Sequence, residues 1–269
     1  TAVKPTSLTE FLVEGIPSSG DAQLRQIADQ QLSGTFDRQS RGGGTYAFTM
    51  RPNVQNRNRG DAVTQALQTI ERRVNEYGVS EPVVAPYGTT GDRIVVELPR
   101  IADVNRAKEL IGRTARLEIK LVEGVASDEQ TLLQSHGGKA PQGMEIKSGV
   151  SGSRTDPTKL QYLVRRTPVV TGTDLRNARP TVDEFNQPAV GFSLNNEGAV
   201  KFGKATGANV GRQLAIILDD FVQSAPVIES RIDREGRISG SFTQQEADDL
   251  ALVLRSGALP ASLSYLEDR

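Results

Sequence analysis

The sequence predicts an α+β fold, in which an α+β subdomain is inserted into a base of repeated βαβ units. Three segments predict the base, because each follows the order strand, helix, strand: residues 10–50, 93–122 and 237–266. Apolar residues three and four positions apart mark the helices, and alternating apolar residues mark the strands. A stretch of different composition separates the second segment from the third, and it predicts the insert.

The first segment and the helix after it show clear periodicity. Short strands are expected at 11–13 and 46–50, on either side of a helix over 21–32. A second helix is expected over 61–77, where apolar residues line one face at intervals of three and four. Gly78 follows this helix and is expected to be its left-handed cap.

The second and third segments repeat the pattern and are expected to share one sheet. Strands at 94–98 and 115–122 flank a helix whose N-cap is Asp103. At the end of the chain, a T-x-x-E capping box opens a helix at Thr243. Residues 263–266 are then expected to form the closing strand of the base.

The insert is expected over residues 124–235, which leaves 1–123 and 236–269 as the base. Within the insert, residues 137–158 are rich in Gly, Ser, Pro and Lys and predict a flexible loop. Strands, a helix and a hairpin are expected after this loop, so the insert is a folded subdomain of its own.

Bulk composition disfavours several classes of function. The net charge is −1, aromatic residues make up 5% and tryptophan is absent, so nucleic acid and anionic lipid are not favoured partners. The absence of cysteine excludes disulfides, zinc–thiolate sites and cysteine nucleophiles. No run of about 18 apolar residues occurs, so this chain is not expected to span a membrane.

Three features imitate catalytic or binding motifs. His136, the only histidine, has no sequence neighbour that would fix its tautomer, and we expect it on a surface loop. Residues 198–206 nearly match the phosphate-binding sequence G-x-x-x-x-G-K-[ST], but Ala205 replaces the hydroxyl residue, which favours an amphipathic helix. Asp219 and Asp220 are expected at a hairpin turn, where adjacent carboxylates diverge into water.

The other charged pairs are expected to lie on solvated surfaces. They are Asp248 with Asp249, Glu267 with Asp268, Arg57 with Arg59, Arg72 with Arg73, and Arg165 with Arg166. Because no set of residues converges on a known catalytic pattern, we expect no catalytic, cofactor-binding or metal-binding residue and no enzymatic activity.

Three stretches resemble signatures of the SecD family, an accessory subunit of the Sec protein-export channel. They read ALQTIERRVNEYGVSEPVV at 66–84, DRIVVELPRIADVNRAKELIGRTARLEIKLVE at 92–123 and ALVLRSGALPASLSYLEDR at 251–269. Their order and spacing are similar to the family's as well. The family's D-L-x-G-G element is missing, so Thr1 is expected to lie downstream of it.

The resemblance implies a fold and a role. In the family this region is the large extracytoplasmic domain between the first two transmembrane helices, with a ferredoxin-like base and an inserted head. The resemblance therefore implies a periplasmic location, contact with unfolded preprotein, and movement of head against base in late, proton-gradient-driven export. SecF and the Sec channel are the implied partners, and the membrane is reached only through helices outside this chain.

A receptor for many unfolded chains needs a shallow apolar groove or a free strand edge, because both ignore sequence. Five apolar residues of the insert are candidates for polypeptide contact: Phe192, Phe202, Ile216, Phe221 and Val222. The alternative is that they form the core of the insert. Head motion requires few contacts at the two chain crossings, which are expected near the hinge candidates Gly124 and Gly236.

Other classes of function stay open. A ferredoxin-like RNA-binding module would need a basic face and exposed aromatic residues, which the composition disfavours. A generic protein-interaction module is compatible with the sequence. A hydrolase would need two carboxylates that converge in a pocket. No cofactor is expected for this chain.

Overall fold

The computed structural model describes residues 1–88, 91–153 and 156–267. It confirms the α+β class, since helices accompany four separate sheets within these ranges. The chain forms two compact units. The N-terminal unit comprises residues 1–64 with 86–94, and the C-terminal unit comprises 65–85 with 95–269.

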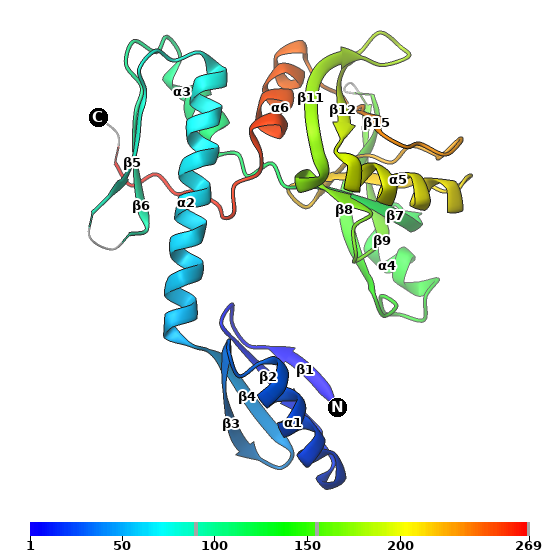
Figure 1. The fold of residues 1–269 in the computed structure, drawn as a ribbon. Coiled ribbons are helices and arrows are strands. Elements are labelled where there is room, and N and C mark those ends of the chain that lie inside the picture. The colour runs from blue at the N-terminus through cyan, green and yellow to red at the C-terminus, as the bar shows by residue number, and fades with distance from the viewer. Residues whose placement is uncertain (89–90, 154–155, 268–269) are drawn as a thin grey trace. The chain divides into compact units, whose positions relative to one another are not determined.

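The N-terminal unit is an antiparallel sheet with one helix (Figure 1). Its elements are β1 (Ala2–Pro5), β2 (Glu10–Glu14), a 3-10 turn (Ser18–Gly20), α1 (Asp21–Gln31), β3 (Phe36–Gly42) and β4 (Thr45–Met50). The strand order is β1-β2-β4-β3, and Phe11 stacks on Phe48 with ring centroids 4.9 Å apart. The strands expected at 11–13 and 46–50 are confirmed, as is the helix between them.

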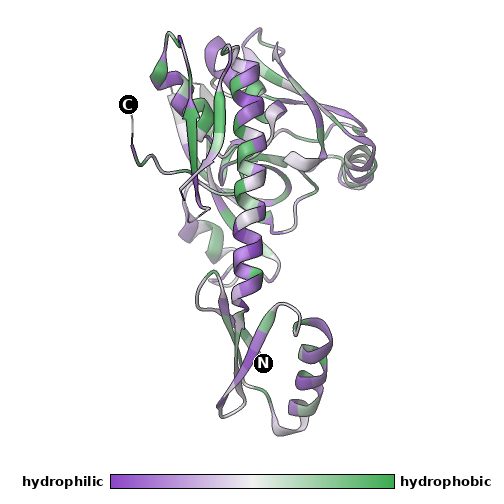
Figure 2. Ribbon diagram, turned by 60° about the vertical axis from the view of Figure 1, so that its left-hand side comes forward, coloured by the Kyte–Doolittle hydropathy of each residue, from purple (hydrophilic) through white to green (hydrophobic). Residues whose placement is uncertain are grey.

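Three elements run through both units: α2 (Pro52–Tyr77), β5 (Val83–Tyr87) and β6 (Arg93–Glu97). The helix begins at Pro52 rather than at 61, because proline is well suited to a first helical position. It ends as expected, with Gly78 at φ 90°. Its buried residues, such as Ile70 and Val74, lie in its C-terminal half, where apolar colours recur in Figure 2.

Residues 117–256 form a β-rich body within the C-terminal unit. Its elements are β7 (Leu117–Ala126), α4 (Glu129–Gln134), β8 (Met144–Ser153), β9 (Asp156–Arg165), β10 (Val170–Thr171), a 3-10 turn (Gly172–Asp174), β11 (Leu175–Val182), β12 (Pro188–Leu194), α5 (Asn196–Ala208), β13 (Leu214–Leu218), β14 (Phe221–Ser224), β15 (Glu235–Ile238) and α6 (Gln244–Ser256). One sheet has the order β10-β7-β13-β14-β8-β9 and closes on itself, because β7 also pairs with β9. The other sheet, β11-β12-β15, packs against α6.

Strand β7 contributes to two cores because its side chains alternate. Leu117, Ile119 and Leu121 belong to the main core, which they share with β12, β13, α5 and α6. Val122 belongs to a smaller core together with Tyr162 and residues of β13 and β14. The continuous apolar run of β13 is buried along its whole length, as both cores require.

The expectation that residues 93–123 and 237–266 share a sheet is wrong. Strands β6, β7 and β15 belong to three different sheets. Both sides of β7 are already taken, by β13 on one side and by β9 and β10 on the other. Residues 263–266 form no strand. The described residues therefore lack the single sheet that would define a ferredoxin-like base.

The expected limits of the insert fall inside paired strands. Gly124 lies within β7, and Gly236 lies within β15. Helix α6 packs against β11 and β12, so most of the segment assigned to the base from 236 onward belongs to the β-rich body. The loop expected over 137–158 is wrong in part, because β8 begins at Met144 and pairs with β9; residues 154–155 lie outside the described residues.

Candidate functional site at the chain crossings

The chain enters and leaves the β-rich body at two neighbouring points. The outbound crossing, residues 113–116, follows α3 (Val104–Gly112) and leads into β7, and the return crossing, residues 257–259, follows α6. The backbone N–H of Leu259 donates to the carbonyl of Thr114 at 3.0 Å, so the two crossings are bonded to each other. The expected N-cap of α3 is confirmed, since Asp103 accepts from the backbone N–H of Arg106.

Arg73 of α2 reaches both crossings. Its side chain is 1% exposed, and Nη1 donates to the carbonyls of Leu110 and Ile111, each at 2.9 Å, and to that of Arg113. Nη2 donates to the carbonyl of Gly257 at 2.9 Å. Carbonyls at helix C-termini lack intrahelical partners and carry partial negative charge, which makes them suitable acceptors for a guanidinium.

The charge of Arg73 is buried without a hydrogen-bonded carboxylate among the described residues. Burial lowers the pKa of Arg73 to about 10, while the nearby charge of Asp219 acts to raise it. The guanidinium therefore stays protonated at neutral pH, although its Nε has no hydrogen-bond partner. The expectation that both arginines of the Arg72 pair face solvent is wrong for Arg73. Its place within the apolar stripe of Ile70 and Val74 is the sequence signal for burial.

Asp219 holds the outbound crossing from the side of the β-rich body. Its carboxylate accepts from Thr114 Oγ1 at 2.6 Å and from the backbone N–H groups of Ala115 and Arg116, at 3.1 and 2.9 Å. The predicted hairpin is confirmed, with Asp219 at φ 50° and Asp220 at φ 68° in its turn. The two carboxylates do diverge: Asp219 turns to the outbound crossing, whereas Asp220 pairs with Lys147 and Arg116.

The backbone of the outbound crossing is itself constrained. Ala115 has φ 51°, which is uncommon for a residue with a Cβ, and it is 2% exposed. Such a conformation persists only where the surroundings hold it. Here, Asp219 and the return crossing supply those surroundings, so the path of the chain into β7 is defined by tertiary contacts.

Few other contacts join α2 and α3 to the β-rich body. Arg106 of α3 pairs with Asp249 at 2.6 Å, and Arg255 of α6 pairs with Glu76 of α2 at 2.5 Å. The hydrogen bond that Arg106 donates to Asp249 raises the pKa of Arg106 against the opposing effect of burial. A small apolar cluster adds Leu110, Ala115 and Val253, with Tyr77 and Leu252 packed against it.

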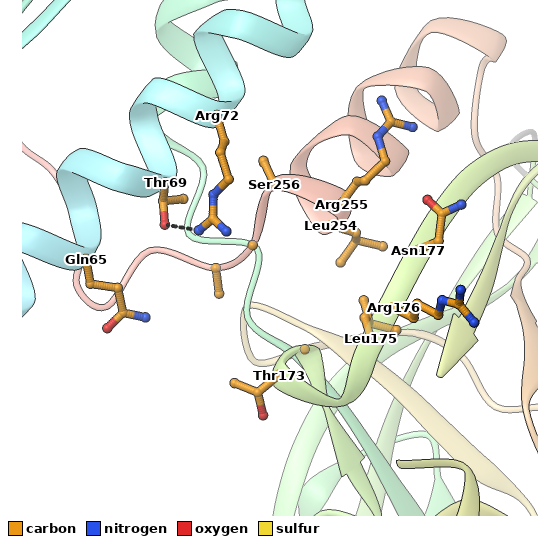
Figure 3. Close-up of a pocket in the computed structure, with 13 residues that line it drawn as sticks. Gln65, Thr69, Arg72, Thr173, Leu175, Arg176, Asn177, Leu254, Arg255 and Ser256 are labelled. Carbon is orange, nitrogen blue, oxygen red and sulfur yellow. Dashed lines mark hydrogen bonds between the residues drawn. The ribbon is translucent and has the colours of Figure 1, made fainter. Parts of the chain in front are cut away.

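A pocket of about 260 Å³ lies beside the return crossing (Figure 3). It is lined by Gln65, Thr69, Arg72, Gly172, Thr173, Leu175, Arg176, Asn177, Leu254, Arg255, Ser256, Gly257 and Ala258. The guanidinium of Arg72 points toward the pocket, whereas those of Arg176 and Arg255 extend away from it. Arg72 is exposed and donates to Thr69 Oγ1 at 3.3 Å. No carboxylate pair converges in this pocket.

The structure places four of the five candidate contact residues in the interior. Phe192, Phe202 and Ile216 belong to the main core, and Val222 belongs to the smaller one. Only Phe221 has substantial exposure, at 37%. Four of the five residues are therefore core residues, as the alternative interpretation expected.

The two hinge candidates have packing roles. A Cβ added at Gly236 would lie 2.3 Å from the ring of Phe192, so only glycine leaves room for this ring. Gly124 lies where the register of β7 against β9 shifts, and an added Cβ would lie 3.2 Å from Leu132.

The near-match to a phosphate-binding motif forms α5, as expected. Asn195 caps this helix by accepting from the backbone N–H of Gly198 at 2.8 Å. A Cβ added at Gly203 would lie 2.3 Å from a carboxylate oxygen of Asp233, so this glycine permits close packing of a loop. His136 is exposed, as expected, and its Nδ1 lies 2.9 Å from Ser135 Oγ.

The remaining charged pairs are mostly on the surface. Arg57, Arg59, Arg165 and Arg166 are exposed, whereas Asp248 and Asp249 are half-buried; Asp268 lies outside the described residues. Within residues 1–88, 91–153 and 156–267, no cluster of three or more metal-ligating side chains occurs. In the same part of the chain, no helix combines the length and apolarity needed to cross a bilayer.

Comparison with known proteins decides the family. The model of the N-terminal part of the SecDF P1 domain matches residues 63–124, and the model of the SecDF P1 head subdomain matches 148–261. The chain belongs to the SecD family. SecD of Aquifex aeolicus is 46% identical over 78% of this chain, and SecD of Koribacter versatilis is 39% identical over 96% of it. The chain spans 39% and 48% of these two relatives.

A solved SecDF chain has a similar fold. It comes from work on "a membrane component SecDF that enhances protein export", and it is 34% identical with a TM-score of 0.59. The match covers 78% of this chain and 93% of that one. The SecDF head model includes β15 and α6, in agreement with their packing in the β-rich body. Residues 1–62, most of the N-terminal unit, lie outside both family models.

Proposed function

We propose that this SecD-family chain is the periplasmic domain of a Sec translocase accessory subunit and that it contacts emerging unfolded preprotein. It acts by binding and movement and catalyses no reaction. In the intact complex, SecF and the Sec channel are its partners, and the proton gradient acts through transmembrane parts outside this chain. The two SecDF family models and the relatives that are named protein translocase subunit SecD support the proposal.

The observation that carries the mechanical part of the proposal is the adjacency of the two crossings. The β-rich body is joined to α2 and α3 by the bonded segments 113–116 and 257–259, two ion pairs and a small apolar cluster. Among the described residues, no sheet continues from one part to the other. Parts joined by two short neighbouring segments can rotate about them as about a hinge. The β-rich body accordingly swings there during late export.

The client surface that fits the geometry is a strand edge. Most of the candidate apolar residues are buried, whereas the sheet β11-β12-β15 ends in two edge strands. Pro180 and a hydrogen bond from Arg255 to the carbonyl of Ala178 obstruct the β11 edge. β15 pairs only with β12 among the described strands, so an extended client can add to its edge by backbone hydrogen bonds.

The test is a titration with one preprotein in its unfolded and folded forms. We expect weak binding of the unfolded form, with a Kd at or above about 1 μM, because a receptor for many sequences forgoes specific contacts. Equal binding of both forms, or binding of neither, contradicts the proposal. A labelled RNA serves as the control ligand, and a salt-dependent shift of this RNA would favour the RNA-binding alternative.

A further inference from the structure

The contacts of Arg73 are divided unequally between the two crossings. Nη1 lies against three carbonyls at the end of α3 and the start of the outbound crossing. Nη2 makes a single hydrogen bond, to the carbonyl of Gly257 in the return crossing. The side chain is thus anchored firmly to α3 and linked to the end of α6 by one bond.

Packing places the anchored end of Arg73 with α2 and α3. Residues of the two helices, among them Val74, Ala107 and Leu110, line a common small cavity together with Arg73. These residues are almost completely buried. When the β-rich body moves, the three bonds to the α3 end can therefore persist, and the bond to Gly257 is the one that must break.

We propose that Arg73 is the positioning residue that fixes the angle between the β-rich body and the α2–α3 pair, by holding the return crossing against the end of α3. The inference rests on the proposed function in taking movement at the crossings as its setting. A guanidinium suits this role because its planar fork directs donors to two crossings at once, which a lysine ammonium cannot do with the same geometry.

The neighbouring contacts are weaker candidates for the same role. The ion pairs of Arg106 with Asp249 and of Arg255 with Glu76 are partly open to solvent, and such pairs add little rigidity. By contrast, Arg73 is buried, and the carbonyl of Gly257 belongs to a C-cap residue at φ 98°, outside the ordinary helical conformation. Loss of the guanidinium leaves buried helix-end carbonyls without a donor.

The test measures the angle directly. Because the chain contains no cysteine, cysteines introduced at exposed Glu109 of α3 and Lys204 of α5 give a unique pair of spin-label sites. We expect a single narrow distance distribution for the parent chain and a clearly broader one for Arg73→Met. Arg73→Lys, which keeps the charge but not the fork, is expected to be intermediate. Arg72→Met is the matched control, and it should leave the distribution unchanged.

A second measurement separates positioning from general stability. Hydrogen exchange in Arg73→Met should be about tenfold faster at the backbone N–H of Leu259, as expected for loss of one hydrogen bond of ordinary net strength. Exchange in β12, within the main core, should be unchanged. Exchange that rises equally in both places means a merely structural role and overturns the inference. If Arg73→Met does not fold, the distance distribution of Arg73→Lys takes its place: a broader distribution than that of the parent chain supports the role of Arg73, and an unchanged one overturns it.

The outcomes also separate this inference from the proposed function. An unchanged distribution in Arg73→Met, or an equal broadening in Arg72→Met, overturns the role of Arg73 even if the parent chain binds unfolded preprotein. A broadened distribution in a chain that binds no preprotein supports the role of Arg73 and counts against the proposed function.

Discussion

Replacing Asp219 by asparagine tests whether the outbound crossing is held by this carboxylate. The substitution keeps the size of the side chain and its tolerance of positive φ, which the turn needs. Both Thr114 Oγ1 and the backbone N–H of Arg116 bond to Oδ1, so the amide oxygen is expected to stay with them. The amide NH2 then faces the backbone N–H of Ala115, which loses its acceptor.

The magnitude follows from burial. Ala115 is 2% exposed, so water cannot replace the lost acceptor, and an unsatisfied buried donor costs about 1–3 kcal/mol. The two remaining bonds also weaken, because charge-assisted bonds are roughly twice as strong as neutral ones. We expect Asp219→Asn to lower the free energy of unfolding by about 2–3 kcal/mol and Tm by about 5–10 °C.

The control lies next in the sequence. Asp220 also has positive φ, but its partners are the side chains of Lys147 and Arg116 rather than buried backbone N–H groups, so Asp220→Asn should cost less than about 1 kcal/mol. Thermal unfolding followed by far-ultraviolet circular dichroism compares the two variants. Equal shifts in Tm, or a larger shift for Asp220→Asn, would refute the role assigned to Asp219.

Two further predictions concern the β-rich body. Gly236→Ala should destabilise the chain by about 1–3 kcal/mol through overpacking against Phe192, as measured by unfolding in urea. Gly191→Ala in the same sheet is the control and should cost less, because the nearest atom would lie 3.5 Å from the added Cβ. Burial acts to raise the pKa of Glu123, but the hydrogen bond from Arg165 and the charge of Arg212 outweigh it and hold the pKa below its ordinary 4.5. Because the folded pKa is depressed, the stabilisation that ionised Glu123 contributes is present above pH 4.5 and is lost as the pH falls through the folded value. Glu123→Gln should therefore flatten the acid limb of a plot of Tm against pH. An unchanged acid limb contradicts this.

Local patterns in the sequence predicted local structure well. The caps at Asp103 and Thr243, the glycine after α2 and the hairpin turn at Asp219 all depend on residues close in sequence, and all are present. The start of α2 was missed, because the polar turns after Pro52 carry no apolar stripe. Periodicity detects a helix through its buried face, and these turns have almost none.

Long-range pairing was not predictable in the same way. The strand pattern of residues 115–122 showed that β7 would pair, but not that β13, β9 and β10 would be its partners. The closing strand expected at 263–266 has an alternating pattern, yet these residues form no strand. The sequence therefore predicts the two crossings near Gly124 and Gly236. In the structure they lie at 113–116, which contains Ala115, and at 257–259, and both are contacted by the buried Arg73.

The candidate site was the least predictable part. Arg73 stands beside Arg72, and a pair of arginines on a long helix ordinarily faces solvent. The apolar face of α2 signals that Arg73 is buried, but the carbonyls that accept its hydrogen bonds belong to residues distant in sequence, at Leu110 and Gly257. Likewise, four of the five apolar residues expected to contact clients are required by the two cores of the β-rich body.

Movement of the β-rich body at the two crossings is tested most directly by single-molecule fluorescence energy transfer between dyes at positions 109 and 204. The transfer is measured before and after addition of an unfolded preprotein. Movement about segments 113–116 and 257–259 predicts one distance in the free chain and a second, different distance when the client binds. One unchanged distance in both conditions would contradict the claim that the β-rich body moves at these crossings.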